Sequence, residues 1–446
     1  MSETASEASS EAVITKAQSL GITLSSIIGA AAVFIVTIIT PKVLSIEENN
    51  QFLVFWALMF GVFGALLGIQ QEVTRAVGEA QTTLVKQIPA QNVASESTRV
   101  IPVAAFWGLI IAGAFLASSA LWGESILGEG YFLSVLLIAV GTVFYACHVS
   151  VVGTAAGSGN WSIFAWLGGW ESVLRLALTG IVAITVGSLW GFKFAAIAPV
   201  LLWLALFAVS AKSRRALGSQ RVAMDFKPFA RNMGWSILTS AAYAVMVTGF
   251  PVLVKATTGT PATAQEQLLL GAVLIGINLT RAPIMIPLQM FQGVAVSAFL
   301  KQRNHPMKAL SKPVIALLGV GIVGAIAAYL IGPFLFDLLY YDYRETLSGT
   351  VLGALTFASA FMAVVVLTGT AALATSKHRL YLGGWMATVA VSVAMLLLPL
   401  PLEGRVILAL IAGPLCGALI HIAGLVLSPA NTSKDKADTA TIKENS

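Results

Sequence analysis

Residues 51–71 read QFLVFWALMFGVFGALLGIQQ and contain no Asp, Glu, Lys or Arg in 21 positions. About 20 apolar residues are enough for a helix to cross a membrane, so this stretch predicts a membrane-spanning helix. Eleven further runs of comparable length lie on either side of it, near 19–41, 101–122, 131–153, 161–187, 194–211, 233–254, 266–300, 313–332, 347–374, 380–400 and 406–427.

The composition supports the same interpretation. Hydrophobic residues make up 57% of the 446 residues and charged residues only 10%, which excludes a soluble multidomain enzyme, a disordered chain and a disulfide scaffold. The apolar runs are longer than the roughly 10 alternating residues of an outer-membrane strand. The expected fold class is therefore all-α integral membrane, with about 12 transmembrane helices. The run 266–300 contains Pro283 and Pro287, which predict one bent helix.

The basic residues indicate the orientation of the chain. With a cytoplasmic N-terminus, 19 of the 26 Lys and Arg residues fall in inner segments and five in outer ones. Positive charge accumulates on the cytoplasmic side of membrane proteins, so both termini are expected in the cytoplasm of a bacterial cell whose plasma membrane holds the protein. The net charge of +6 follows from this bias, and no nucleic-acid partner is expected. The five outer residues are Lys42, Lys193, Lys255, Arg344 and Arg405.

The longest basic connection predicts the domain organisation. Residues 212–232 form a cytoplasmic linker between a first six-helix half, 19–211, and a second, 233–427. Polar cytoplasmic tails, 1–18 and 428–446, precede and follow them. Two halves of equal helix number are typical of transporters built from internal repeats.

The fifth run carries two charges at the depth of the membrane. Glu171 and Arg175 are four residues apart, so they share one helix face and can pair. Counting about 1.5 Å per residue from Trp161 places Glu171 about 15 Å deep. Charges in the hydrocarbon layer are costly and mark pathways. A structural ion pair and a substrate or coupling-ion site both fit this pattern, and Glu171 is the expected coupling residue.

The eighth run carries a polar stripe around a second arginine. Its members recur at helical spacing and so share one face, which should contact protein or water and not lipid. A water-filled cavity and a buried helix–helix interface are both compatible with it. The stripe consists of Asn278, Arg281, Met285, Gln289 and Gln292.

The remaining candidates lie near helix ends. Gln71 and Arg75 follow Gly64 and Gly68 along the second run, and Lys42 and Lys255 lie at the outer ends of the first and seventh runs. Snorkelling toward the interface is the alternative role for these cations. In the spans only Glu171 is expected to oppose this cationic series, which suits an anionic substrate because Arg binds phosphate through a bidentate fork.

Cys147 and His148 adjoin in the fourth run. A packed thiol and a hydrogen-bonded histidine are expected there, with no chemistry. Neither cysteine spacing nor histidine spacing predicts a metal site.

Four stretches resemble Wzx-like polysaccharide flippases of the multidrug/oligosaccharidyl-lipid/polysaccharide superfamily. They occur in the same helix order, and the resemblance extends over nearly the whole chain. They are TPKVLSIEENNQFLVFWALMFGVFGALLGIQQEVTRA (40–76), WESVLRLAL (170–178), LTRAPIMIPLQMFQGVAVSAFL (279–300) and LTGTAALATSKHRLYLGGW (367–385).

The resemblance implies two six-helix bundles around a central cavity that opens alternately to each side. It implies transport of a polyprenyl-phosphate-linked saccharide from the inner to the outer leaflet, for cell-surface polysaccharide or cell-wall assembly. The residues expected to bind its phosphate or sugar are Arg75, Arg175, Arg281, Asn278, Gln289, Gln71, Lys42 and Lys255.

No enzyme activity and no cofactor are expected of such a transporter. Coupling to a proton, to sodium or to the membrane potential is expected, and the partners would be the anionic glycolipid, membrane lipids and glycosyltransferases of the same pathway. Two other functions remain open. A drug or metabolite antiporter of the same superfamily should carry several acids in its spans. A membrane glycosyltransferase or polymerase should carry catalytic acids on a large outer loop, which this chain lacks.

Overall fold

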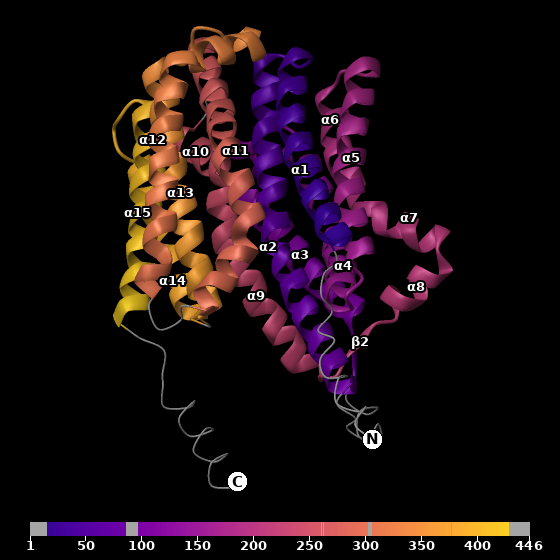
Figure 1. Cartoon of the computed structure of the whole chain (residues 1–446). Coiled ribbons are helices and arrows are strands. Elements are labelled where there is room, and N and C mark those ends of the chain that lie inside the picture. The colour runs from indigo at the N-terminus through magenta and orange to yellow at the C-terminus, as the bar shows by residue number, and fades with distance from the viewer. Residues whose placement is uncertain are drawn as a thin grey trace, which may run out of the picture. The chain divides into compact units, whose positions relative to one another are not determined.

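The structure, a computed structural model, describes residues 16–85, 97–259, 261, 263–301, 306–375 and 377–427. Within them the protein is nearly all helical, as predicted (Figure 1). The helices are α1 Lys16–Ile39, α2 Ile46–Val85, α3 Val100–Leu127, α4 Tyr131–Gly157, α5 Trp161–Thr185, α6 Leu189–Ile197, α7 Leu202–Val209, α8 Ala211–Gly218, α9 Phe226–Val247, α10 Phe250–Thr258, α11 Ala264–Lys301, α12 Pro306–Leu339, α13 Gly349–Ala374, α14 His378–Leu396 and α15 Leu402–Leu427.

The helices account for the predicted spans. In the described part of the chain, ten helical segments are long and apolar enough to cross a membrane. The pair α9 and α10, bent by 63°, would be the eleventh. The predicted eighth run is a single helix, α11. The chain is therefore a multi-pass membrane protein.

Two predicted spans are broken in the structure. The sixth consists of α6, a 3-10 turn (Ala198–Leu201) that contains Pro199, and α7, and Figure 1 shows α7 and α8 turning away from the line of α5 and α6. The seventh breaks between α9 and α10, where Gly249 and Pro251 follow each other closely. Proline cannot donate a backbone hydrogen bond, so each break falls where the helical ladder is interrupted.

The described residues group into two compact units, Met1–Gln267 and Leu268–Ser446. In the first unit α2 packs against α4 and α9, α3 against α4, and α1 against α5. In the second unit α12 packs against α13, and α15 against α13 and α14. The predicted division of the chain at 212–232 remains a prediction, as does the central cavity.

The predicted linker 212–232 contains regular structure. It includes most of α8, the two-residue strand β2 (Arg221–Val222) and the start of α9. Strand β2 pairs antiparallel with β1 (Thr98–Arg99), with Thr98 opposite Val222 and Arg99 opposite Arg221. The linker is therefore tied by backbone hydrogen bonds to the segment that precedes α3.

Candidate functional site

Helix α5 places a buried ion pair inside the first unit. Glu171 and Arg175 lie one turn apart, and the Oε1 atom of Glu171 is 2.5 Å from the Nη2 atom of Arg175. Their side chains are 13% and 5% exposed. The pairing expected from their spacing is thus confirmed, and their role in transport stays a prediction.

Arg175 also joins α5 to two other helices. Its Nε atom donates a hydrogen bond of 3.1 Å to the carbonyl of Ala196, in the last turn of α6, where an α-helix leaves carbonyls without an intrahelical partner. Its guanidinium lies over the ring of Phe60 in α2, 5.2 Å from the ring centroid. Three groups therefore orient this arginine. They are the carboxylate of Glu171, the carbonyl of Ala196 and the ring of Phe60.

His148 of α4 is the second partner of Glu171. Its Nε2 atom lies 3.2 Å from Oε2 of Glu171, and the ring is 2% exposed. The ring stacks with Tyr145, which in turn stacks with Phe63 of α2. The sequence led us to expect a hydrogen-bonded histidine without chemistry, and Glu171 is its partner. We call His148, Glu171 and Arg175 the ionic cluster.

A buried cation missed by the sequence analysis lies in the same unit. Lys193 was placed in an outer segment, but α6 begins at Leu189 and carries Lys193 with only 3% of its surface exposed. Its Nζ atom donates to Oγ of Ser134 at 2.9 Å. Extending the sixth apolar run by one turn toward its start would have found this residue, since Phe192 and Phe194 flank it.

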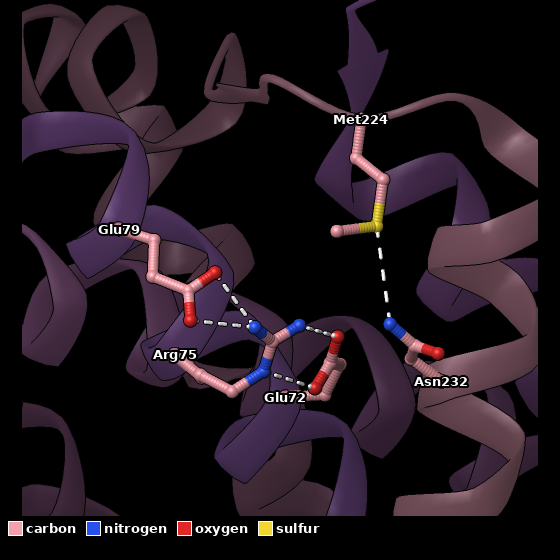
Figure 2. Close-up of polar contacts among 5 residues, drawn as sticks. All are labelled: Glu72, Arg75, Glu79, Met224 and Asn232. Carbon is pink, nitrogen blue, oxygen red and sulfur yellow. Dashed lines mark hydrogen bonds and ion pairs between the residues drawn. The ribbon is translucent and has the colours of Figure 1, made fainter. Parts of the chain in front are cut away.

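Arg75 is more fully neutralised than its sequence suggested. All three nitrogens of its guanidinium donate to carboxylates (Figure 2): Nε and Nη2 to Glu72, at 2.9 and 2.5 Å, and Nη1 to Glu79 at 2.6 Å. Glu72 is 5% exposed and lies within the apolar segment Ile46–Ala80. The expectation that Glu171 alone opposes the cations of the spans is therefore wrong. The helix α2 runs past the predicted end of the second span and places both partners on the face of Arg75, at i−3 and i+4.

Figure 2 draws a second polar contact in the same view. Asn232 of α9 donates to the sulfur of Met224 at 3.9 Å. Arg75 itself is 42% exposed. Because Glu72 is buried and Arg75 binds both of its carboxylate oxygens, loss of this arginine would leave a buried carboxylate without its main partner.

In the second unit, Arg281 is buried on α11, with 7% of its surface exposed. Asn278, one turn earlier, is half-buried and donates to the carbonyl of Leu274 at 3.2 Å. The side chain of Gln289 lies outside the described residues, as do those of Met285 and Gln292. The predicted stripe is thus described only at its start.

The remaining candidates lie at helix ends or surfaces. Lys42 and Gln71 are exposed. Lys255 donates to the carbonyl of Gly259 at 2.8 Å, as basic residues commonly do at the end of a helix. Among the predicted site residues, the first unit therefore brings together Glu171 and Arg175 and leaves these three apart.

Within the described residues, no group of three or more His, Cys, Asp or Glu side chains is placed to hold a metal ion. The ionic cluster instead joins one carboxylate to two donors, because Glu171 accepts from His148 and Arg175. An anion that reached Arg175 would compete with this carboxylate.

Comparison with known proteins identifies relatives of this chain by sequence. No protein-family model matches the chain. It is 34% identical over 402 residues to the uncharacterized protein Rv1510 of Mycobacterium tuberculosis, with 90% of each chain covered. It is 32% identical over 378 residues to the uncharacterized protein Rv3630 of the same organism, with 84% of each covered.

Solved transporter structures share the architecture. An inward-facing multidrug resistance MATE family transporter of the MOP superfamily superposes with a TM-score of 0.62 at 13% identity, over 92% of this chain and 98% of that one. A eukaryotic MATE transporter gives 0.63 at 12% identity, over 94% and 97%. A MOP superfamily transporter from Pyrococcus furiosus, described as having a binding pocket of reverse polarity, gives 0.60 at 13% identity, over 92% and 95%.

Proposed function

Because this chain belongs to the family of the mycobacterial proteins Rv1510 and Rv3630 and has the fold of MATE transporters of the MOP superfamily, we propose that it is a flippase. Its substrate is an anionic, polyprenyl-phosphate-linked saccharide, moved from the inner to the outer leaflet of a bacterial plasma membrane. Transport proceeds by alternating access and serves cell-surface polysaccharide or cell-wall assembly.

One observation carries this proposal: each unit contains buried cations. Arg175 and Lys193 are 4% and 3% exposed in the first unit, and Arg281 is 7% exposed in the second. Glu171 balances only one of the two cations in the first unit. Since a charge in a low-dielectric interior attracts its opposite far more strongly than it does in water, such an interior favours an anionic headgroup over a cationic one.

The ionic cluster supplies a mechanism for coupling. Without substrate, Glu171 holds Arg175, and His148 donates to the other carboxylate oxygen. When the substrate phosphate takes the arginine, the carboxylate loses its main partner and gains affinity for a proton or a cation. Binding of the anion and uptake of a coupling ion are thereby linked through one side chain.

A second candidate function is export of small organic cations in exchange for protons. The observation that favours it is Glu72, a second buried acid in an apolar segment, because an antiporter of this superfamily was expected to carry several acids in its spans. Both carboxylate oxygens of Glu72 are, however, bound by Arg75, which weighs against a cation site there.

An assay in proteoliposomes made from the purified full-length protein distinguishes the two functions. Flipping of a fluorescent polyprenyl-phosphate saccharide and proton-driven movement of ethidium are measured on the same preparation. We expect lipid flipping, and we expect Arg281→Ala to abolish it. Arg281→Lys should restore it only in part, because a point charge replaces a bidentate fork.

Lys227→Ala is the matched control, since Lys227 is exposed at the start of α9. It should flip lipid at the wild-type rate. Ethidium movement without lipid flipping would favour the antiporter and overturn the flippase. Normal flipping by Arg281→Ala would make this arginine structural.

A further inference from the structure

Lys193 is enclosed on three sides by described residues of the first unit. Its ammonium lies 4.5 Å from the ring centroid of Trp190 and 5.5 Å from that of Phe55. The third contact is the hydroxyl of Ser134, 2.9 Å away. We call Phe55, Ser134, Trp190 and Lys193 the lysine cage.

Among the described residues of the first unit, Lys193 is less neutralised than Arg175 or Arg75. Arg175 has the carboxylate of Glu171, and Arg75 has two carboxylates. Among the described residues, Lys193 takes part in no ion pair, and its partners are one hydroxyl and two aromatic faces. Its charge is therefore left without an opposite charge.

The local backbone does not offset this charge. Lys193 lies in the second turn of α6, beyond the first turn that the Ser188 hydroxyl caps, and a helix terminus acts on charges only within its first or last turn. Burial of a charge without a partner is costly, so an apolar side chain such as Met would serve packing better at this position.

Two further features fit an anion at the cage. The hydroxyl of Ser134 accepts from Lys193, and its own proton is donated to no described group, so it remains available to an anion's oxygen. Trp190 is only partly buried, whereas Phe55 is fully buried. Trp190 is therefore the less enclosed of the two aromatic partners of the ammonium.

We propose that Lys193 and Ser134 form an anion-binding site for a phosphate group, with Trp190 as its movable cover. This inference rests on the proposed function, because it assigns the phosphate of the transported lipid a first contact in α6. The ammonium and the hydroxyl donate to phosphate oxygens, and the indole moves aside from the ammonium. The same chemistry would bind free phosphate.

The test uses the full-length protein in an uncharged detergent and follows its Tm with dodecyl phosphate, inorganic phosphate or dodecyltrimethylammonium. A ligand that binds only the folded protein raises Tm in proportion to its affinity. We expect dodecyl phosphate to raise Tm and the cation to leave it unchanged. Competition by inorganic phosphate would indicate a site for the free anion, and its absence a site for the lipid headgroup.

Variants locate the site. Lys193→Met should weaken dodecyl phosphate binding at least about tenfold, and its Tm without phosphate should equal or exceed that of the wild-type protein, because the unbalanced charge is gone. Lys193→Arg should bind within a few-fold of wild type. Lys227→Met, the same substitution at an exposed site of the same unit, should bind as wild type does.

Three outcomes would overturn this site. The first is that Lys193→Met binds dodecyl phosphate as tightly as the wild-type protein does. Loss of folding by Lys193→Met, with Lys193→Arg folded, would make the lysine structural. Failure of the wild-type protein to bind dodecyl phosphate at all would overturn both the site and the anionic substrate. By contrast, lipid flipping that survives in Lys193→Met with unchanged phosphate binding would remove only this inference.

Discussion

At the residue scale, Glu171 is the group on which the first unit's polar interior depends. It binds Arg175 on its own helix and His148 on α4, and Arg175 extends the connection to α6 and α2. Four helices thus meet around one carboxylate. Spacing in α5 predicted the first of these contacts, whereas the others depend on side chains far away in the sequence.

Single substitutions of this pair should destabilise the protein. Glu171→Gln leaves Arg175 buried without its carboxylate, and Arg175→Gln leaves Glu171 with His148 alone. Each should lower the free energy of unfolding by about 3–5 kcal/mol, the usual effect of breaking a buried pair. Thermal unfolding in detergent, measured beside folded yield, checks this.

The double variant, Glu171→Gln with Arg175→Gln, distinguishes structure from transport. Stability should largely return, because no orphan charge remains. Lipid flipping should stay lost if the pair binds substrate or couples transport. Recovery of flipping together with stability would show that the pair is purely structural.

At the element scale, close helix packing in the second unit depends on small residues. His421 of α15 is fully buried, with Nδ1 3.1 Å from the Thr368 hydroxyl of α13 and Nε2 3.2 Å from the Tyr381 carbonyl of α14. A Cβ at Gly384 would overlap the His421 ring. Glycine is therefore required where α14 passes this histidine.

Adjacent glycines in α14 allow a matched comparison. Gly384→Ala should lower stability by about 1–3 kcal/mol, the cost of overpacking a close contact. Gly383→Ala meets no atom within 4 Å and should be neutral or stabilising by up to about 1 kcal/mol, since alanine favours helix over glycine. The two Tm values, measured in one detergent, should differ in this order; equal values would contradict the packing described for His421.

At the scale of the whole molecule, the described residues form two helical units in a single membrane protein. The charge bias predicts that the connection after α8 is cytoplasmic and that the connection between α12 and α13 is external. Ser219 and Asp342 are exposed in these two connections. Cysteines at these two exposed positions can therefore report the orientation of the chain in the membrane without disturbing side-chain packing.

Thiol labelling in intact cells tests this orientation. In a variant without Cys147 and Cys416, Ser219→Cys should resist a membrane-impermeant maleimide, and Asp342→Cys should react. Labelling after cell lysis is the control that both thiols are accessible. Reaction of Ser219→Cys from outside would reverse the predicted topology.

The amino-acid sequence by itself determined the order and approximate ends of most spans, although it predicted twelve where the described residues contain ten or eleven candidates. Apolar length is a local property, and a membrane leaves an exposed backbone few alternatives to a helix. The sequence also predicted the Glu171–Arg175 pair, because i and i+4 residues meet on any helix. It placed Arg281 on the polar face of a spanning helix, where its burial is confirmed, and its expected binding of phosphate stays a prediction.

Glu72 and Glu79 engage Arg75 within α2, at the local spacings i−3 and i+4, and the prediction missed them because the helix continues beyond its apolar run. Only the tertiary structure decided the contacts between helices. His148 reaches Glu171, and Ser134 reaches Lys193, across separate helices. Such pairings depend on how helices pack, and packing of side chains distant in sequence has no periodic signal along the chain. The sequence therefore predicted the charged residues of α5, whereas their partners on other helices, and with them the balance of charge, could not be predicted.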